Sequence, residues 1–584
     1  MLGSETGIGA EVVAGTADAT RPRLPARLRA SVRAHAALGV TLLAVALFGA
    51  LCLYQIRLPG LYYDEAYDVV PAMQLLHGQP VQLARGVGIH LFGRAFPVMI
   101  GDYWGTVSTY AVLPLFWLLG VGVLPLRLWP IGAGMLAVLF TFALGRRLFG
   151  TGTGVAAALL LAVFPSFVFW SRVGIYVISH IVAITLGSIL AFLIWRAGGR
   201  RRWLFLAALL AGIGLTTKLL FIWFLIAIPA AYLLLLAADW LAAPSRAPLR
   251  DSWARLRADV PVTSPLDLVA AGAGFLLGAF PVIYYNLVSR GSYLVLRANL
   301  TQTNRGVDNF ALWHNAKVEL DAVRVLLDGG YFWFYGGIYT NPLWPPIAGI
   351  AAAGLLVLTH AAPELRRYRR ATVFLLAFSA VIFVLSCFTV SILGPTHLLI
   401  LVPIPQLLVA AFALLGGRWL AGRLAGPLRL APLALAGLLL VALAAGDLLV
   451  DARYHQALAR TGGYTNFSSA IYTLAEQLEA EGAARPYALD WGFKYNLEII
   501  TNGRVVPQEI YGATYEPGPD FEAAVRRALA DPNAVFIAHV EGSESFPRLD
   551  AFRRIVAESG RQLVLVRTDK ELSGRPAYYE FRVK

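Results

Sequence analysis

The sequence predicts a mainly helical protein that crosses a membrane many times and carries a smaller mixed helix-and-strand domain at its C-terminal end. Apolar residues make up 58% of the 584 residues, whereas charged residues make up only 14%. Soluble domains carry about 25% charged residues, so this composition excludes a soluble enzyme. The high apolar content also excludes a disordered chain, and two cysteines are too few for a disulfide scaffold.

Long apolar runs are the second observation behind this fold class. A helix needs about 20 apolar residues to cross roughly 30 Å of hydrocarbon. Eleven runs approach that length: 37–56, 128–145, 152–170, 175–195, 203–217, 219–238, 265–285, 342–360, 371–391, 396–415 and 428–449. The run at 109–126 is also apolar. If it crossed the membrane, every later arginine cluster would lie on the outer side of the membrane. We therefore expect 109–126 to form a helix at the outer surface.

The arginines are the third observation, because they orient the spans. The net charge of +14 comes largely from arginines in an N-terminal tail (1–36) and in short loops. The loop clusters are Arg146-Arg147, Arg196 with Arg200 to Arg202, Arg246/Arg250/Arg255/Arg257, Arg366-Arg367 with Arg369-Arg370, and Arg418/Arg423. Arginine-rich short loops stay cytoplasmic, and these clusters fall on alternate loops. This predicts a multi-pass cell (plasma or inner) membrane protein with a cytoplasmic N-terminus. Dispersal over many loops also excludes a nucleic-acid partner.

Three polar regions are then expected on the outer side of a membrane domain at 37–450. They are a first loop at 57–127, a second at 286–341 and a C-terminal domain at 451–584. The last region alternates helix-like stretches with strand-like runs at 534–540 and 561–567, which predicts a small α/β domain. Both cysteines, Cys52 and Cys387, fall in predicted spans and are interpreted as buried apolar residues.

Acidic residues follow the first predicted span directly. Asp64 and Glu65 are adjacent, Tyr63 precedes them, and Asp68 shares a helical face with Asp64. Carboxylates at a membrane boundary are costly unless they are used, so we interpret this stretch as a candidate site. The alternative interpretation is that these acids lie in the solvent-exposed first turn of a helix, where negative charges are favoured.

A second stretch of the first loop has the composition of a binding loop. Asp102, Tyr103 and Trp104 lie among glycines and aromatic residues, and we interpret them, with Tyr63 and Asp68, as candidate contacts to an acceptor or a sugar. An interfacial aromatic belt is the alternative.

Basic side chains near the predicted outer face are few. They are Arg127, Arg172, Lys218 and His397, with Arg305, His314 and Lys317 as secondary candidates. The positive-inside rule disfavours cations on this side, so each is expected to have an anionic partner, either a protein acid or a phosphate. Snorkelling to lipid headgroups is the alternative.

The order and placement of these motifs resemble the glycosyltransferase C superfamily. The similarity is strongest to the branch that contains protein O-mannosyltransferases, aminoarabinose transferases and their bacterial relatives, and it covers about 37–450. The matching stretches are Asp64-Glu65, Arg127, Arg146 to Gly150, Ser171-Arg172, Gly214 to Lys218, and Pro395 to Leu399. Two departures stand out. Relatives often have Arg or Tyr followed by Pro where this chain has His397-Leu398, and the chain lacks the Trp-Trp-Asp motif of oligosaccharyltransferases.

The resemblance implies an activity and roles for single residues. Members of the superfamily transfer a sugar, with inversion, from a polyprenyl-phosphate carrier at the outer face of the membrane. The acceptor would be a hydroxyl group of a lipid, a glycan or a protein. By resemblance Asp64 would be the catalytic base, and Glu65 would orient the site or, in metal-using relatives, help to hold a divalent metal ion. Lys218, Arg172 and His397 would contact the carrier phosphate, with Arg127 beside them supporting the loop. The resemblance implies no cofactor other than such a metal ion.

Two other functions remain open from the sequence. A lipid-linked glycan polymerase or ligase also has many spans and a large outer loop, but relies on arginines of later loops. A transporter or flippase of lipid-linked sugars would instead require charged residues in mid-span and broken helices in paired halves.

Overall fold

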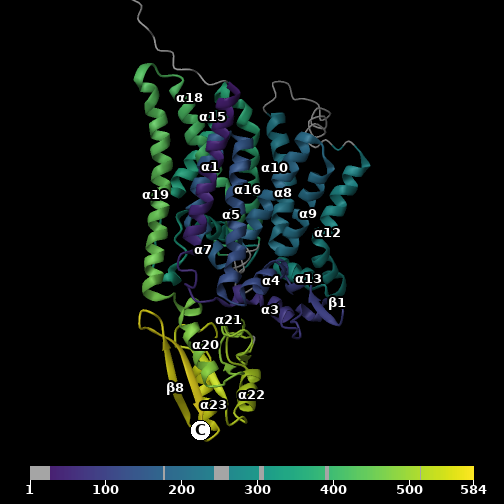
Figure 1. The fold of residues 1–584 in the computed structure, drawn as a ribbon, viewed down its shortest axis with the longest axis vertical. Coiled ribbons are helices and arrows are strands. Elements are labelled where there is room, and N and C mark those ends of the chain that lie inside the picture. The colour runs from purple at the N-terminus through teal and green to yellow at the C-terminus, as the bar shows by residue number, and fades with distance from the viewer. Residues whose placement is uncertain are drawn as a thin grey trace, which may run out of the picture.

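The computed structural model describes residues 26–174, 178–241, 262, 264–301, 308–388, 394–512 and 514–584. A long helical bundle occupies one end of the molecule, and a mixed sheet with its own helices occupies the other (Figure 1). Among these described residues, nine helices are long and apolar enough to cross a membrane, or ten if one bent pair counts as a single span. The predicted fold class, a multi-pass helical bundle with an α/β C-terminal region, is confirmed.

The spans follow the predicted apolar runs. They are built on α1 (Ala26–Leu53), α5 (Val123–Leu148), α8 (Ile178–Gly198), α10 (Ile222–Leu241), α12 (Pro265–Ser289), α15 (Trp344–Ala361), α16 (Arg369–Ser386), α17 (Ile404–Ala411) with α18 (Gly417–Ala421), and α19 (Leu430–Thr461). Helix α19 has 32 residues, about 48 Å at 1.5 Å per residue. It therefore runs the length of the bundle and continues toward the C-terminal sheet (Figure 1).

Two of the eleven expected runs do not form single long helices. The run at 152–170 is split into α6 (Thr151–Ala162) and α7 (Pro165–Val173), which are bent by 59°. Pro165 starts α7 and has no N–H to continue the ladder of α6, so the chain turns there. The run at 203–217 forms α9 (Arg201–Thr217), which is 17 residues long and packs between α8 and α12.

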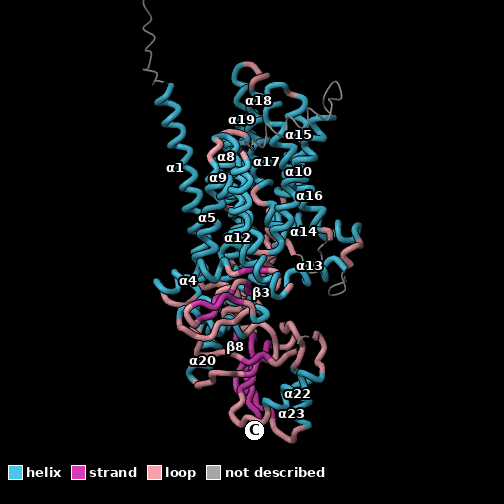
Figure 2. The backbone as a smooth tube through the Cα atoms, turned by 90° about the vertical axis from the view of Figure 1, so that its right-hand side faces the viewer, coloured by secondary structure: helices cyan, strands magenta, loops and turns pink. Residues whose placement is uncertain are grey.

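The first loop forms a layer of short elements below the bundle. They are α2 (Tyr63–Tyr67), α3 (Val70–Leu76), the hairpins β1 (Gly88–Leu91) with β2 (Arg94–Pro97) and β3 (Met99–Gly101) with β4 (Trp104–Gly105), and α4 (Val107–Leu119). Figure 2 shows this layer between the bundle and the C-terminal sheet. With 13 residues α4 is too short to span a bilayer, which agrees with the expectation that 109–126 is not a span. The second polar region forms α13 (Gly291–Thr301), α14 (Leu312–Asp328) and a 3₁₀ turn at Trp333–Tyr335.

Residues 462–584, here called the C-terminal unit, contain a five-stranded sheet in the order β6-β5-β7-β9-β8. Strand β5 (Tyr487–Ala488) is parallel to β6 (Gln508–Glu509) and β7 (Val535–His539), whereas β9 (Pro576–Val583) is antiparallel to β7 and β8 (Leu563–Lys570). The predicted strands at 534–540 and 561–567 are β7 and β8. The helices of the unit are α20 (Ala470–Ala480), α21 (Lys494–Ile500), α22 (Pro519–Ala528) and α23 (Leu549–Glu558).

Ion pairs that involve arginines join neighbouring helices of the bundle. Arg369 and Arg370 both pair with Asp239 at the end of α10, at 3.1 and 3.3 Å. Arg201 pairs with Asp267 at 3.0 Å, which joins the start of α9 to the start of α12. The predicted cluster at 246–257 and the candidate Arg305 lie outside the described residues.

Candidate active site

A buried arginine fixes the turn between the first span and α2. Arg127, near the start of α5, donates from Nη2 to Glu65 Oε1 at 2.6 Å and from Nε to Glu65 Oε2 at 3.1 Å. Its remaining N–H groups donate to the carbonyl oxygens of Ile56, Pro59 and Gly60, at 2.6, 3.1 and 3.3 Å. Both side chains are almost fully buried, at 0% and 1% exposure. A guanidinium group has five N–H donors, so Arg127 has none left for a phosphate, and both oxygens of Glu65 are bound.

Arg172, on α7, holds the other part of the same turn. Its Nη2 donates to the carbonyl oxygens of Tyr54, Gln55 and Leu58, at 2.8, 2.8 and 2.9 Å. Its Nη1 lies 3.2 Å from His455 Nδ1 on α19. Arg172 thus binds carbonyl groups of the segment that follows the end of α1. The two arginines thus bind six carbonyl groups between residues 54 and 60 and direct the chain into α2.

Helix α2 carries two acids toward the same region. Asp64 lies in its first turn and is half-buried, and Asp68 follows its last turn and is buried. Thr109 Oγ1 on α4 donates to the backbone oxygen of Asp68 at 2.7 Å. Burial raises the pKa of Asp68 to about 8, and the negative charge of Asp64 acts in the same direction, while Lys218 opposes both. At neutral pH the carboxyl of Asp68 therefore holds a proton for most of the time.

Lys218 comes from the connection between α9 and α10. Its backbone forms an antiparallel bridge with Trp104, and the N–H of Leu219 donates to the carbonyl of Tyr103 at 2.8 Å. Gly105 permits this approach, because a Cβ there would lie 2.3 Å from the Thr216 backbone oxygen. The hairpin of the first loop therefore docks beside Lys218.

His397, just before α17, completes a cluster with Lys218 and the two acids. The Nζ of Lys218 lies 3.3 Å from Nε2 of His397. Burial lowers the pKa of Lys218 to about 8, and the charges of Asp68 and Asp64 oppose that shift. Burial and the charge of Lys218 also hold the pKa of His397 well below its usual value, so its imidazole is neutral. We call Asp64, Asp68, Lys218 and His397 the acid–lysine cluster.

The other predicted contacts of the first loop, Asp102, Tyr103 and Trp104, have different neighbours. Asp102 accepts two hydrogen bonds from Arg85, at 2.7 and 2.8 Å, and one from Tyr285 Oη at 2.5 Å. These hydrogen bonds, with that of Arg85 the strongest, lower the pKa of Asp102. Trp104 packs edge-on against Tyr103 at 4.2 Å, and Tyr103 is exposed. Asp102 therefore ties the hairpin to α12, while Trp104 adjoins the acid–lysine cluster.

Tyr63 faces the C-terminal unit. Its hydroxyl donates to Glu509 at 2.8 Å, and its ring packs against Trp491 at 4.6 Å and Tyr495 at 4.8 Å. No sequence motif marks Glu509 or Tyr495 as a site residue. Their contact with Tyr63 depends on the docking of the C-terminal unit, more than 400 residues away in the chain.

Metal-ligating residues do not gather at this site in the described parts of the chain. Within those parts no group of three His, Cys, Asp or Glu side chains is placed to hold a metal ion. Among the secondary candidates, Lys317 lies on α14 with its Nζ 5.3 Å from the ring centre of Trp313.

Comparison with known proteins identifies proteins of similar sequence and fold. Residues 107–247 match the family model described as dolichyl-phosphate-mannose-protein mannosyltransferase. ArnT from Cupriavidus metallidurans in the apo state is 16% identical, and the match covers 93% of this chain and 98% of ArnT with a TM-score of 0.57. The chain has the fold of ArnT. The resemblance predicted from the sequence is thus confirmed, since the matched family and ArnT are both glycosyltransferases.

Two further structures share this fold. ArnT from Cupriavidus metallidurans bound to undecaprenyl phosphate is 14% identical, with 95% of this chain and 98% of that chain covered and a TM-score of 0.54. The Archaeoglobus fulgidus oligosaccharyltransferase in complex with Zn and sulfate is 14% identical, with 89% and 69% covered and a TM-score of 0.51. No curated protein matches the chain.

Proposed function

We propose that this protein is an integral-membrane glycosyltransferase that moves a sugar from a polyprenyl-phosphate carrier to a hydroxyl acceptor, with inversion. The reaction would take place on the face of the membrane that carries the C-terminal unit, which we assign to the outside. The mannosyltransferase family model and the undecaprenyl-phosphate complex of ArnT support this class of donor. The observation that carries the proposal is the acid–lysine cluster, which joins three segments that are far apart in the sequence.

The chemistry needs a base on one side of the sugar and a cation on the other. Asp64 takes the proton of the acceptor hydroxyl as its oxygen attacks the anomeric carbon. The bond from that carbon to the phosphate oxygen breaks, and its electron pair leaves with the carrier phosphate. The ammonium group of Lys218 stabilises the charge of the departing phosphate. Attack opposite to the leaving group inverts the configuration at the anomeric carbon.

The protonated state of Asp68 supports this division of roles. Two ionised carboxylates beside a single lysine would repel an incoming phosphate. Because the pKa of Asp68 is raised to about 8, the cluster keeps one negative charge at neutral pH and Lys218 remains available to the donor. The neutral imidazole of His397 accepts a hydrogen bond from Lys218 and orients it. We assign His397 as a positioning residue beside the carrier phosphate.

The arginine contacts support a positioning role as well. Arg127 and Arg172 bind backbone carbonyls between residues 54 and 60, and Glu65 binds Arg127. We assign these three residues to holding α2, and with it Asp64, in place. Tyr103 and Trp104 beside Lys218 are the side chains that we assign to the sugar.

Transfer from defined donors tests the proposal. The purified protein in nanodiscs is incubated with undecaprenyl-phosphate-linked hexoses and pentoses and a panel of hydroxyl acceptors, and products are identified by mass spectrometry. We expect one donor to lose its sugar to an acceptor and Asp64→Asn to abolish that transfer. Asp550→Asn, which changes an acid that is 99% exposed, is the matched control and should keep full activity. Full transfer by Asp64→Asn, or movement of an intact lipid-linked sugar across the bilayer without transfer, would overturn the proposal.

A further inference from the structure

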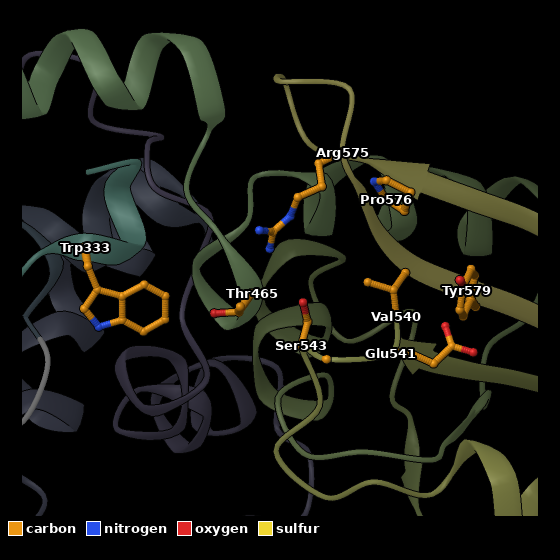
Figure 3. Close-up of a pocket in the computed structure, with 9 residues that line it drawn as sticks. Trp333, Thr465, Val540, Glu541, Ser543, Arg575, Pro576 and Tyr579 are labelled. Atoms are coloured by element: carbon orange, nitrogen blue, oxygen red, sulfur yellow. The ribbon is translucent and has the colours of Figure 1, made fainter. Parts of the chain in front are cut away.

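A cleft separate from the acid–lysine cluster opens where the bundle meets the C-terminal unit (Figure 3). Its volume is about 500 Å³, which falls in the range of roughly 300–1,000 Å³ found for small-molecule sites. Trp333, in the turn after α14, forms the bundle side of the cleft. The C-terminal unit supplies the other side with Thr465, Glu541, Ser543, Arg575 and Tyr579. The cleft therefore exists only while the two parts are docked.

The lining combines a flat apolar ring with hydrogen-bonding groups. Trp333 is 52% exposed and offers its indole to the cleft. In Figure 3 the Arg575 guanidinium and the Thr465 side chain reach into the gap that Trp333 faces, with Ser543 beside them. A pyranose ring has a C–H face that packs on an aromatic ring and a rim of hydroxyls that bind hydroxyl, guanidinium and carboxylate groups.

The charges of the cleft favour a neutral ligand. Arg575 lies 3.4 Å from the buried carboxylate of Glu571, and its guanidinium carbon stands 4.6 Å from the ring centre of Tyr464. Glu541 pairs with Arg553 at 2.5 Å. Each charged side chain of the lining thus has its own counter-ion, which holds it in place and leaves little net attraction for an anion.

The loop that forms one wall is fixed before any ligand arrives. The buried carboxylate of Asp490 accepts hydrogen bonds from the backbone N–H groups of Ser545 and Phe546, at 3.0 and 2.8 Å. His539 Nδ1 lies 2.7 Å from the same carboxylate, at the end of β7. A wall that is already ordered loses little conformational freedom on binding, which favours affinity.

Stacked aromatic rings connect the cleft to α2, the helix that carries Asp64. Phe334, next to Trp333, stacks on Phe467 with ring centres 4.0 Å apart, and Phe467 stacks on Tyr62 at 4.3 Å. Tyr62 is the residue that precedes α2 and therefore Asp64. Two stacked ring pairs therefore link the cleft to the turn that positions the proposed base.

We infer that this cleft binds a neutral saccharide, namely the glycan part of the acceptor, at a distance from the reacting hydroxyl. The acceptor assignment rests on the proposed function, whereas saccharide binding by the cleft does not. The acceptor class named by this inference is a glycan or a glycolipid, held by its sugar rings between Trp333 and Arg575.

Binding of soluble sugars to the full-length protein tests the inference without any donor. Neutral tri- to hexasaccharides of hexoses and pentoses are presented to the protein in nanodiscs, and binding is measured by saturation-transfer NMR. We expect at least one class to bind, and Trp333→Ala and Arg575→Ala each to weaken it by about tenfold or more. Trp313→Ala is the matched control, because Trp313 is 76% exposed on α14 outside the cleft. It should bind like the wild type.

A second variant separates loss of binding from loss of folding. Trp333→Phe keeps an aromatic ring and should retain more binding than Trp333→Ala at an unchanged thermal midpoint. Asp64→Asn should bind the saccharide like the wild type although it transfers nothing. Saccharide binding by a wild-type protein that transfers no sugar would overturn only the proposed function. The inference is overturned if no neutral saccharide binds the wild type, if Trp333→Ala binds equally well, or if phosphorylated sugars bind more tightly than neutral ones.

Discussion

Replacing Glu65 by glutamine would leave a fully buried guanidinium without its counter-charge. Removing one partner of a buried ion pair costs about 3–5 kcal/mol. In this site three carbonyl oxygens still accept hydrogen bonds from Arg127, and the glutamine oxygen can accept another. We therefore expect the lower end of that range, about 3 kcal/mol, and a thermal midpoint lowered by several degrees.

Thermal unfolding in detergent, followed by the fluorescence of the fourteen tryptophans, measures this loss. The double variant Glu65→Leu with Arg127→Met leaves no buried charge unpaired, but it also removes the donors of three carbonyl groups, so its midpoint should stay below that of the wild type. Asp550→Asn should melt like the wild type. A Glu65→Gln protein or a double variant that is as stable as the wild type would refute the buried-pair reasoning.

Three further predictions concern neighbouring groups. Because the pKa of Lys218 is lowered to about 8, its charge is present below that pH and lost above it, so kcat/KM for the donor should fall as pH rises through about 8. Lys218→Arg should move this fall to higher pH in the pH–rate profile, and an unmoved fall would contradict the role of the lysine. Tyr63→Phe leaves the Glu509 carboxylate without its hydroxyl donor, which should lower stability by about 1–3 kcal/mol; an unchanged thermal midpoint would count against this contact. Asp102→Asn should keep transfer activity with a small change in thermal midpoint, because its pair with Arg85 is partly exposed; loss of transfer equal to that of Asp64→Asn would instead place Asp102 on the substrate.

The sequence predicts the membrane fold well, because apolar runs and arginine loops report on the bilayer directly. It could not predict the break between α6 and α7, because a proline within an apolar run is compatible with a kinked span as well as with a broken one. It also could not predict that α9 stops at 17 residues, since the turn at Lys218 depends on the hairpin that docks there.

The candidate site was predicted in part. The sequence indicated that the cations near the outer face need anionic partners, either a protein acid or a phosphate. In the structure Arg127 binds the acid Glu65, whereas Arg172 binds a set of backbone carbonyls. Which cation binds backbone carbonyls and which one lies beside acids depends on tertiary contacts that spacing does not encode. The same holds for Glu509 and Tyr495, which contact α2 only through the fold.

The most direct test of the central claim separates donor binding from the chemical step. Single-turnover transfer from an undecaprenyl-phosphate-linked sugar, together with the donor Kd, is measured for Asp64→Asn and Lys218→Ala. If Asp64 is the base and Lys218 the phosphate cation, Asp64→Asn should slow transfer by about 10²–10⁴-fold with an unchanged donor Kd. Lys218→Ala should weaken donor binding and slow transfer by about 10²-fold or more. Transfer by Asp64→Asn at the wild-type rate would contradict the account.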